Sequence, residues 1–431
     1  MTLPSFTMAM PKTGKRSIAL GVFINSFVIT PAIALEYELE NHTVELGGRA
    51  RIAHVNADNS ANNISNDARD MSLLLRFRVN SEWTPQFSTL LELDHVSLAW
   101  QNEFSNGEFF NNTPIIPDAG GTDLNQALFR YSPTNTLQLT LGREAINLGN
   151  ERFIGSNSFW QNEQTLDTAG FNYEFGFASN FLYRYIDNAN RITGSNAGKK
   201  LSPSDSNFDA NNGQRPAAFL GDHDHDTHLL FAEFKEWDYS KIHAYYFDIN
   251  IKDAAALSNK TLGSRYEYKG RWNKLRTQAH GELALQQRTE INNDATLQFY
   301  DIGAGIGYGA NELSINYQQL GENNGTSFVT PLASLHEQNG WVDKFLTTPK
   351  SGLRDYSLQY IWRQSPIKVD ARYHIFRSDS QNLAIGEEFD IDIIYKFNRE
   401  NSVLFRYADF FSRDDDFTDE KRVFLMYTHN L

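Results

Sequence analysis

The feature of this sequence that most restricts its fold is an alternation of apolar and polar residues that recurs in short segments. In one of them, Leu75, Phe77 and Val79 alternate with Arg76 and Arg78. Alternation with period two is typical of a β-strand that has one apolar and one polar face. No helical period is sustained after residue 34, so the pattern predicts an all-β protein. The clearest segments are 73–79, 127–131, 137–141, 181–185, 356–362, 369–375, 389–397 and 423–427.

The connections between the expected strands alternate between short and long. The eight short ones contain turn-forming residues, as at 132–135 and 398–401. A soluble sandwich or propeller would not require this order, whereas a transmembrane barrel has short periplasmic turns and long extracellular loops. Nine long and eight short connections imply about eighteen strands. The long connections are 56–70, 101–122, 143–168, 188–226, 250–261, 289–295, 321–354, 378–385 and 412–420.

The alternating segments fit a membrane wall, although the mean hydropathy is −0.50. A transmembrane strand needs only about 9–11 residues with every second one apolar, and a hydropathy window averages that signal away. The sequence contains 31 Phe, 19 Tyr and 7 Trp, and aromatic residues form girdles at both interfaces of such barrels. We therefore expect a transmembrane antiparallel β-barrel in the bacterial outer membrane, in contact with lipid and lipopolysaccharide.

The first 34 residues resemble a secretory signal peptide. Lys12, Lys15 and Arg16 precede an apolar run at 18–29, and the small residues at 32–34 give a cleavage site. The run is shorter than the roughly 20 residues that a membrane-spanning helix needs. We expect residues 1–34 to be removed and residues 35–431 to form one barrel domain. The chain has no cysteine, so closure of the sheet has to replace disulfides.

The charged residues of the expected strands fall between the apolar ones and point into the lumen if the apolar series faces lipid. An arginine facing lipid at the midplane would cost about 2–4 kcal/mol, which favours this orientation. Either these arginines pair with carboxylates such as Glu92 and Asp392, or some stay unpaired and form a constriction that favours anionic solutes. The inward arginines are Arg76, Arg78, Arg130, Arg184, Arg265, Arg271, Arg363, Arg372 and Arg406.

One segment carries a family resemblance. Residues 139–155 read LTLGREAINLGNERFIG and are followed by Trp160 and by QTLD at 164–167. This run resembles the pattern LxLGRQxIxxGDxRxIG, then W, then RTFDG, of the alginate export family of outer-membrane channels. Residues 371–377 and 386–392 are similar to late strands of that family.

The resemblance implies an 18-stranded, monomeric barrel with an arginine-lined pore for an anionic polysaccharide such as alginate. By motif it assigns Arg143 and Arg152 as pore-lining cations on a connection that folds inward at the constriction. The pattern has Gln, Asp and Arg where this chain has Glu144, Asn150 and Gln164. The last change removes one positive charge near the expected pore.

Other motifs suggest different functions. The segment 222–228 places His223 and His225 on one side of a strand, a spacing that suits a metal ion but is more often a solvated loop end. Aspartates at 414–416 fit either Ca²⁺ bridged to lipopolysaccharide or a solvated loop. An enzyme barrel would need a nucleophile beside a histidine. The single histidines of the expected wall are scattered: His95, His243, His280 and His374.

The sequence therefore predicts a passive outer-membrane channel, not an enzyme and without a cofactor, for anionic sugars or oligosaccharides. The alternative is a general or nutrient-specific porin without a preference for polyanions, and a barrel enzyme is a less favoured third possibility. The net charge of −14 argues against nucleic acid as a partner.

Overall fold

The computed structural model describes residues 35–39, 41–57, 67–101, 103–108, 113–176, 178–194, 220–291 and 295–429. The expected signal peptide, residues 1–34, lies outside the described residues. The strands are β1 (Leu35–Leu39), β2 (His42–Ala57), β3 (Asp67–Thr84), β4 (Phe87–Leu98), β5 (Gly121–Tyr131), β6 (Leu137–Glu144), β7 (Thr165–Phe175), β8 (Ser179–Asn190), β9 (Asp222–Trp237), β10 (Ser240–Ile249), β11 (Asn259–Trp272), β12 (Leu275–Arg288), β13 (Thr296–Tyr308), β14 (Asn311–Leu320), β15 (Glu322–Asn323), β16 (Thr326–Ser327), β17 (Leu353–Gln364), β18 (Ile367–Arg377), β19 (Ala384–Lys396), β20 (Asn401–Ser412) and β21 (Glu420–His429). Two short 3₁₀ helices are η3 (Lys252–Leu257) and η4 (Leu335–Glu337).

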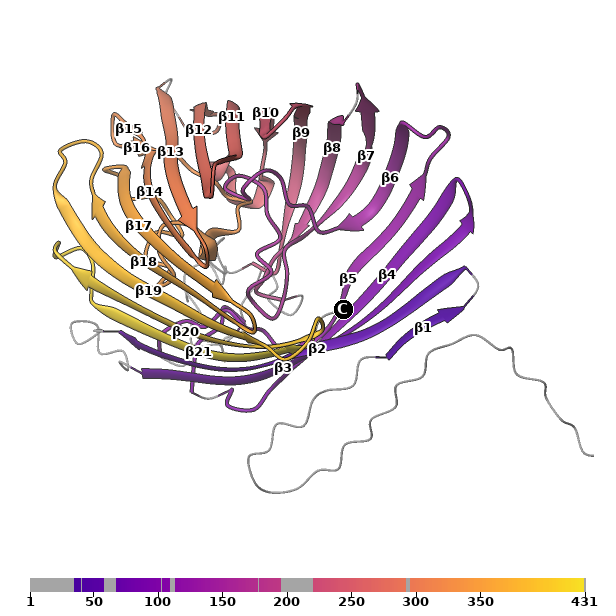
Figure 1. The fold of residues 1–431 in the computed structure, drawn as a ribbon, viewed down its shortest axis with the longest axis horizontal. Helices are drawn as coiled ribbons and strands as arrows, with labels where there is room; N and C mark the ends of the chain where they lie inside the picture. The colour runs from indigo at the N-terminus through magenta and orange to yellow at the C-terminus, as the bar shows by residue number, and fades with distance from the viewer. Residues whose placement is uncertain are drawn as a thin grey trace, which may run out of the picture.

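Eighteen of the described strands form one closed antiparallel barrel, which confirms the predicted fold class and strand number. Strands β2 to β14 and β17 to β21 pair with their neighbours in chain order around the wall (Figure 1). Strands β2 and β21 close the barrel, with a register that runs from Gly48 opposite His429 to Ala57 opposite Glu420. The short strand β1 pairs with the first residues of β2. Closure gives each of the eighteen described wall strands a partner on both sides, as a sheet in lipid requires.

The two ends of the barrel carry different connections, as predicted. At one end, neighbouring strands are joined by tight turns, such as 85–86 between β3 and β4 and 273–274 between β11 and β12. At the other end the connections are longer, and those at 145–164 and 321–352 are the longest that are described throughout. None of the helices in the described residues has the length and apolar character that a membrane-spanning helix requires.

The outer wall is apolar between the two ends. Leu141, Leu262 and Ile315 point outward and are 59%, 59% and 62% exposed, whereas the inward residues Glu92 and Asp301 are buried. Exposed aromatic residues at the tight-turn end are Trp83, Trp237, Tyr239, Trp272, Tyr308 and Phe397. An apolar belt with an aromatic girdle is the surface that a barrel presents to a bilayer.

The two longest described connections fill part of the barrel interior. Their residues Phe153, Leu332 and Val342 are buried in one apolar cluster with the inward wall residues Phe247 and Phe299. The rings of Phe153 and Phe299 meet edge to face, with centroids 5.4 Å apart. Burial of a phenylalanine side chain contributes about 1.5–3 kcal/mol. The packing therefore fixes both connections in place and gives the lumen its shape.

Candidate functional site

Two segments narrow the lumen, and we call them the inner connections: residues 145–164, between β6 and β7, and residues 321–352, between β14 and β17. In Figure 1 the segment after β6 lies inside the ring of strands. The two inner connections touch at a short parallel bridge between Ile154 and Leu332. Next to the bridge, the N–H of Gly155 donates to the carbonyl of Leu332 at 2.8 Å. Segments far apart in the sequence thus form one body within the lumen.

Arg152, on the first inner connection, is only 1% exposed. Its Nη1 donates to Oδ1 of Asn339 at 2.8 Å, and its guanidinium lies 5.7 Å from the ring centroid of Phe299. Asn339 in turn donates to Gln318 at 2.8 Å and to Asp355 at 3.0 Å. Burial lowers the pKa of Arg152 to about 10, so the side chain stays charged at neutral pH. The cation links both inner connections to the wall and does not face open lumen.

Arg143 is not on the inner connection, contrary to the expectation, because strand β6 continues to Glu144. Its Nε and Nη2 donate to the two carboxylate oxygens of Asp167 at 2.7 Å and 3.0 Å, and its Nη1 donates to the carbonyl of Leu124 at 3.1 Å. The side chain is 25% exposed and lines a cavity of about 240 Å³. The other polar residues of this cavity are Asp94, Asp123, Asn125, Asn162, Glu163, Thr165, Asn188, Asn190, Arg191 and Asp222.

Arg191 is a cation of this cavity that the sequence reasoning missed. It follows strand β8, and its Nη1 donates to Gln164 Oε1 and to the carbonyl of Pro331, both at 3.2 Å. Burial lowers the pKa of Arg191 to about 10. The family pattern has an arginine at position 164. In this chain that position is Gln164, and the guanidinium of Arg191 lies next to it. No local sequence pattern identifies Arg191 as a cavity residue, because its hydrogen-bond partners lie on the two inner connections, far away in the sequence.

Most of the inward arginines predicted from the sequence pair with carboxylates. Arg76 and Arg406 each bind one carboxylate through two nitrogens, at distances of 2.7–2.8 Å. Within the described residues, the predicted arginines Arg130 and Arg271 make no ion pair, and neither does Arg152. The pairs are Arg76 with Asp94 and Glu163, Arg78 with Glu92, Arg184 with Glu144, Arg363 with Glu312, and Arg406 with Asp392. Most of the positive charge on the lumen wall is therefore neutralised locally.

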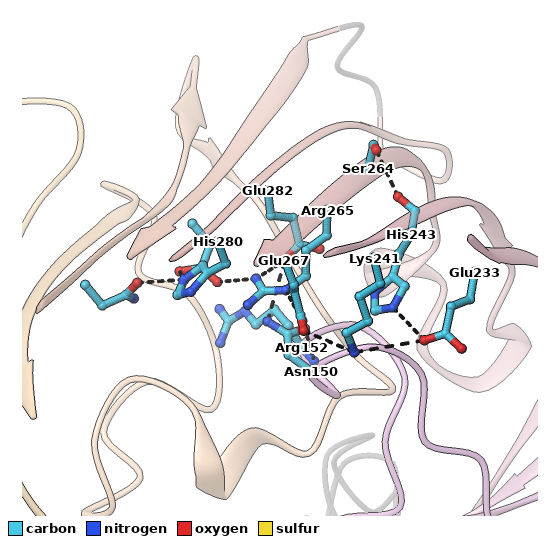
Figure 2. A network of polar contacts seen from close by, with 12 residues as sticks. Asn150, Arg152, Glu233, Lys241, His243, Ser264, Arg265, Glu267, His280 and Glu282 are labelled. Carbon is cyan, nitrogen blue, oxygen red and sulfur yellow. Dashed lines mark hydrogen bonds and ion pairs between the residues drawn. The ribbon is translucent and has the colours of Figure 1, made fainter. Parts of the chain in front are cut away.

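Figure 2 shows one part of this paired wall, on strands β10 to β13. Arg265 Nη1 contacts Glu282 at 2.9 Å and Asp301 at 2.7 Å. Its Nε contacts Glu267 at 2.8 Å, and Lys241 reaches the other oxygen of Glu267 at 3.1 Å. Three carboxylates thus meet two cations across neighbouring strands. Such a network braces the wall and leaves little unbalanced charge.

A second cavity, of about 310 Å³, lies between this wall and the second inner connection. Arg372 reaches into it with 29% of its side chain exposed, and its Nε contacts the carboxylate of Asp370 at 3.4 Å. The Arg372 guanidinium lies 4.9 Å from the ring centroid of Trp341. Much of the remaining lining is neutral and polar. Its amide residues are Gln278, Asn316, Gln318, Gln338, Asn339 and Gln359.

The histidines lie apart from one another. His223 and His225 are buried with ring centroids 6.3 Å apart. In the described ranges, no group of three or more histidine, aspartate or glutamate side chains is arranged to hold a metal ion. Of the four wall histidines, His95 bonds with the Thr122 hydroxyl at 2.7 Å, and the other three face carboxylates at separate places. These contacts are His243 with Glu233 at 3.0 Å, His280 with Asp301 at 3.3 Å and His374 with Asp355 at 2.8 Å.

The fold is similar to that of several solved porins. OccK9 (OpdG) of Pseudomonas aeruginosa matches with a TM-score of 0.67 and 15% identity, over 91% of this chain and 99% of that chain. OccAB2 of Acinetobacter baumannii matches with a TM-score of 0.67 and 15% identity, over 90% and 98%. A BenF-like porin of Pseudomonas fluorescens matches with a TM-score of 0.65 and 10% identity, over 91% and 100%.

The sequence matches no protein-family model and no curated protein. The resemblance to the alginate export family therefore remains a prediction. The closed eighteen-stranded wall, its apolar belt and the similarity to porin structures agree on the broader assignment. The chain is a porin-like barrel of the bacterial outer membrane.

Proposed function

We propose that the barrel is a monomeric channel for passive diffusion and that it selects acidic saccharides, such as uronate oligosaccharides. The observation that carries this proposal is that the two cavities beside the inner connections combine neutral amides with two kinds of arginine. Arg372 is weakly paired, and Arg143 belongs to a part-exposed ion pair. Amides exchange hydrogen bonds with sugar hydroxyls, and a guanidinium binds carboxylate through two nitrogens.

Arg372 is the cation best suited to a solute carboxylate. Its contact with Asp370 is 3.4 Å long, whereas Arg406 contacts Asp392 at 2.7 Å through each of two nitrogens. A long, single contact leaves most of the five guanidinium N–H donors of Arg372 free for a solute. Trp341 holds the planar group from one side. A solute in the 310 Å³ cavity could then contact Arg372 and the surrounding amides together.

Arg143 is the corresponding cation of the 240 Å³ cavity. Its carboxylate partner Asp167 is 34% exposed, so water screens the pair and weakens it. Arg191 adds a second positive charge to the same cavity. A solute carboxylate can compete for an exposed pair of this kind far more easily than for a buried one.

A second candidate is a nutrient-specific or general porin without a preference for polyanions. The paired wall favours it, because Arg76, Arg184 and Arg265 are occupied by carboxylates of the protein itself. The two candidates differ in one measurable property, which is how strongly an acidic sugar blocks the current compared with a neutral sugar of the same size.

The test is planar-bilayer conductance of the refolded barrel, with reversal potentials under a salt gradient and added uronate or neutral oligosaccharides. We expect anion selectivity and block by uronates in the parent chain. In Arg372→Gln and Arg143→Gln the block should weaken by about tenfold or more, because a hydrogen bond to a charged group is worth roughly 1.5–3 kcal/mol.

The matched control is Arg399→Gln, which removes the same charge from an exposed tight turn outside the lumen. It should leave both selectivity and block unchanged. Cation selectivity with equal block by acidic and neutral sugars would reject the acidic-saccharide proposal and leave the general porin. A barrel that does not conduct at all would reject the channel itself.

A further inference from the structure

Two arginines face each other on the outer surface of the barrel, at the end that carries the long connections. In the antiparallel register of β17 and β18, Arg354 lies directly opposite Arg377. Both continue the outward series of their strands, in which Tyr356 and Ile375 are 41% and 40% exposed. Like charges directly opposite each other destabilise a sheet unless another group compensates them. The pair therefore requires an anion.

The protein supplies only part of that compensation. Arg354 donates through Nε to Oδ1 of Asp379 at 2.9 Å, and its Nη2 lies 2.8 Å from the same oxygen. Asp379 also accepts the N–H of Glu322 at 3.0 Å. Arg377 donates through Nε and Nη2 to the carbonyl of Asn382 at 3.1 Å and 3.0 Å. A carbonyl satisfies donors without cancelling charge, so the Arg377 cation keeps its full charge.

A third arginine extends the group along the rim. Arg413 follows β20, and its backbone N–H donates to the carbonyl of Ile385 at 2.8 Å. Its side chain is 56% exposed and approaches Glu387 at 3.6 Å. The Glu387 carboxylate is already the acceptor of the Tyr373 hydroxyl at 2.7 Å. We call Arg354, Arg377 and Arg413 the rim arginines. Only two carboxylates, those of Asp379 and Glu387, lie close to these three cations in the described residues, and each also accepts a hydrogen bond from another group.

The rim arginines lie at the level where lipid head groups begin. On the outward side, the rings of Tyr317 and Tyr356 lie next to each other, with centroids 5.0 Å apart, and Tyr373 lies on the neighbouring strand. Leu358 continues the outer surface of β17 toward the tight-turn end and is 46% exposed. Tyrosines mark the membrane interface in barrels. Cations directly beyond a tyrosine row therefore meet head groups, not acyl chains.

Strands β10 and β11, whose register is described throughout, carry a different arrangement. At the end of β10 and β11 that carries the long connections, Lys260 pairs with Asp248 at 3.1 Å, so one carboxylate balances one cation. Lys252, on η3, is exposed. These lysines provide a charge-matched comparison on a part of the rim where no two arginines oppose each other in the described register.

We propose that the rim arginines bind the phosphorylated head group of an outer-leaflet glycolipid of the lipid A type. A phosphate accepts paired N–H donors from guanidinium groups, which matches the geometry that the opposed arginines offer. The acyl chains would then lie along the apolar wall below the tyrosines. This site is on the outer surface and does not depend on which solute crosses the lumen.

The test uses the full barrel in vesicles that contain either bis-phosphorylated lipid A or the same lipid without its phosphates. Native mass spectrometry counts the lipid retained after mild extraction. The parent chain should retain the phosphorylated lipid and lose the dephosphorylated one. Arg354→Gln/Arg377→Gln should retain it at least about tenfold less, given the usual strength of charged hydrogen bonds. Lys252→Gln/Lys260→Gln should behave like the parent.

Three results would overturn the proposal: full retention by the double arginine variant, equal retention of the dephosphorylated lipid, or displacement of the lipid by millimolar inorganic phosphate. The last result would mean that the site takes a soluble anion. Unchanged conductance shows that each variant has folded. Arg377→Lys keeps the charge but loses the planar fork, and we expect it to retain an intermediate amount of lipid.

Discussion

Replacement of Gly340 by alanine should displace the second inner connection and change the channel current. Gly340 has a left-handed backbone, with φ of +87°. A Cβ placed on it would lie 2.5 Å from Cδ and 2.6 Å from Oε1 of Glu388. That carboxylate also accepts the N–H of Val342 at 2.8 Å. The connection therefore rests directly on a wall residue, and an added methyl group cannot fit without movement.

The expected cost has two parts. A left-handed conformation costs a non-glycine residue about 1–2 kcal/mol, and forcing an extra methyl group into a packed site costs about 1–3 kcal/mol. Gly325 separates the two parts. Its φ is +74°, but a Cβ there meets nothing within 4 Å. Gly325→Ala should show the backbone cost alone, so Gly340→Ala should be worse by about 1–3 kcal/mol, or roughly five- to 150-fold in the population of the native arrangement.

Single-channel recording and thermal unfolding of both variants test this reasoning. Gly340→Ala should show a second conductance level, because the displaced connection opens part of the lumen, and a lower unfolding midpoint than Gly325→Ala. If the two variants have the same conductance levels and the same midpoint, then the close approach of Gly340 to Glu388 does not hold the connection in place.

Two further predictions concern buried charges. His336 accepts a hydrogen bond from Arg406 at Nε2 and donates from Nδ1 to Asp343. Burial lowers the pKa of His336 below 6.5. As pH falls, this histidine therefore takes up a proton in the unfolded chain before it does so in the folded chain, and the free energy of unfolding should decrease below about pH 6.5. Unfolding midpoints at pH 7.5 and 5.5 should differ more in the parent than in His336→Gln, and equal differences would contradict this. Arg51 and Asp118 form a fully buried ion pair; Asp118→Ala should cost about 3–5 kcal/mol in chemical unfolding, whereas Arg51→Leu/Asp118→Leu should cost much less. A double variant that is no more stable than Asp118→Ala would refute that reasoning.

The sequence was sufficient to predict the wall of the barrel because period-two alternation and turn residues are local signals. Arg76 and Arg78 could be oriented from their apolar neighbours alone, and the structure places both inside. The pairing of strands followed from the order of short and long connections. Strand ends were predicted less well: β9 begins at Asp222, inside the predicted connection 188–226, and β6 includes Arg143 because the family motif continues across the end of β6 into the connection.

The interior could not be predicted, because it depends on contacts between distant segments. The bridge of Ile154 with Leu332 joins two connections that carry no shared local pattern. Trp341 packs under the Arg372 guanidinium, and no spacing in the sequence links them. Whether an inward arginine is paired also depends on its neighbour across the sheet. For these reasons the sequence left both interpretations of the inward arginines open.

The seam between β2 and β21 also sets the order of assembly. It joins positions 48 and 429, so closure must wait for nearly the whole chain, and the entropy of joining ends that far apart is roughly 5 kcal/mol beyond a constant term. Contacts of such long range are the ones that slow folding. Until the seam forms, β2 and β21 are unpaired edges that can recruit strands of other chains. The period before closure is therefore when this protein is most exposed to aggregation.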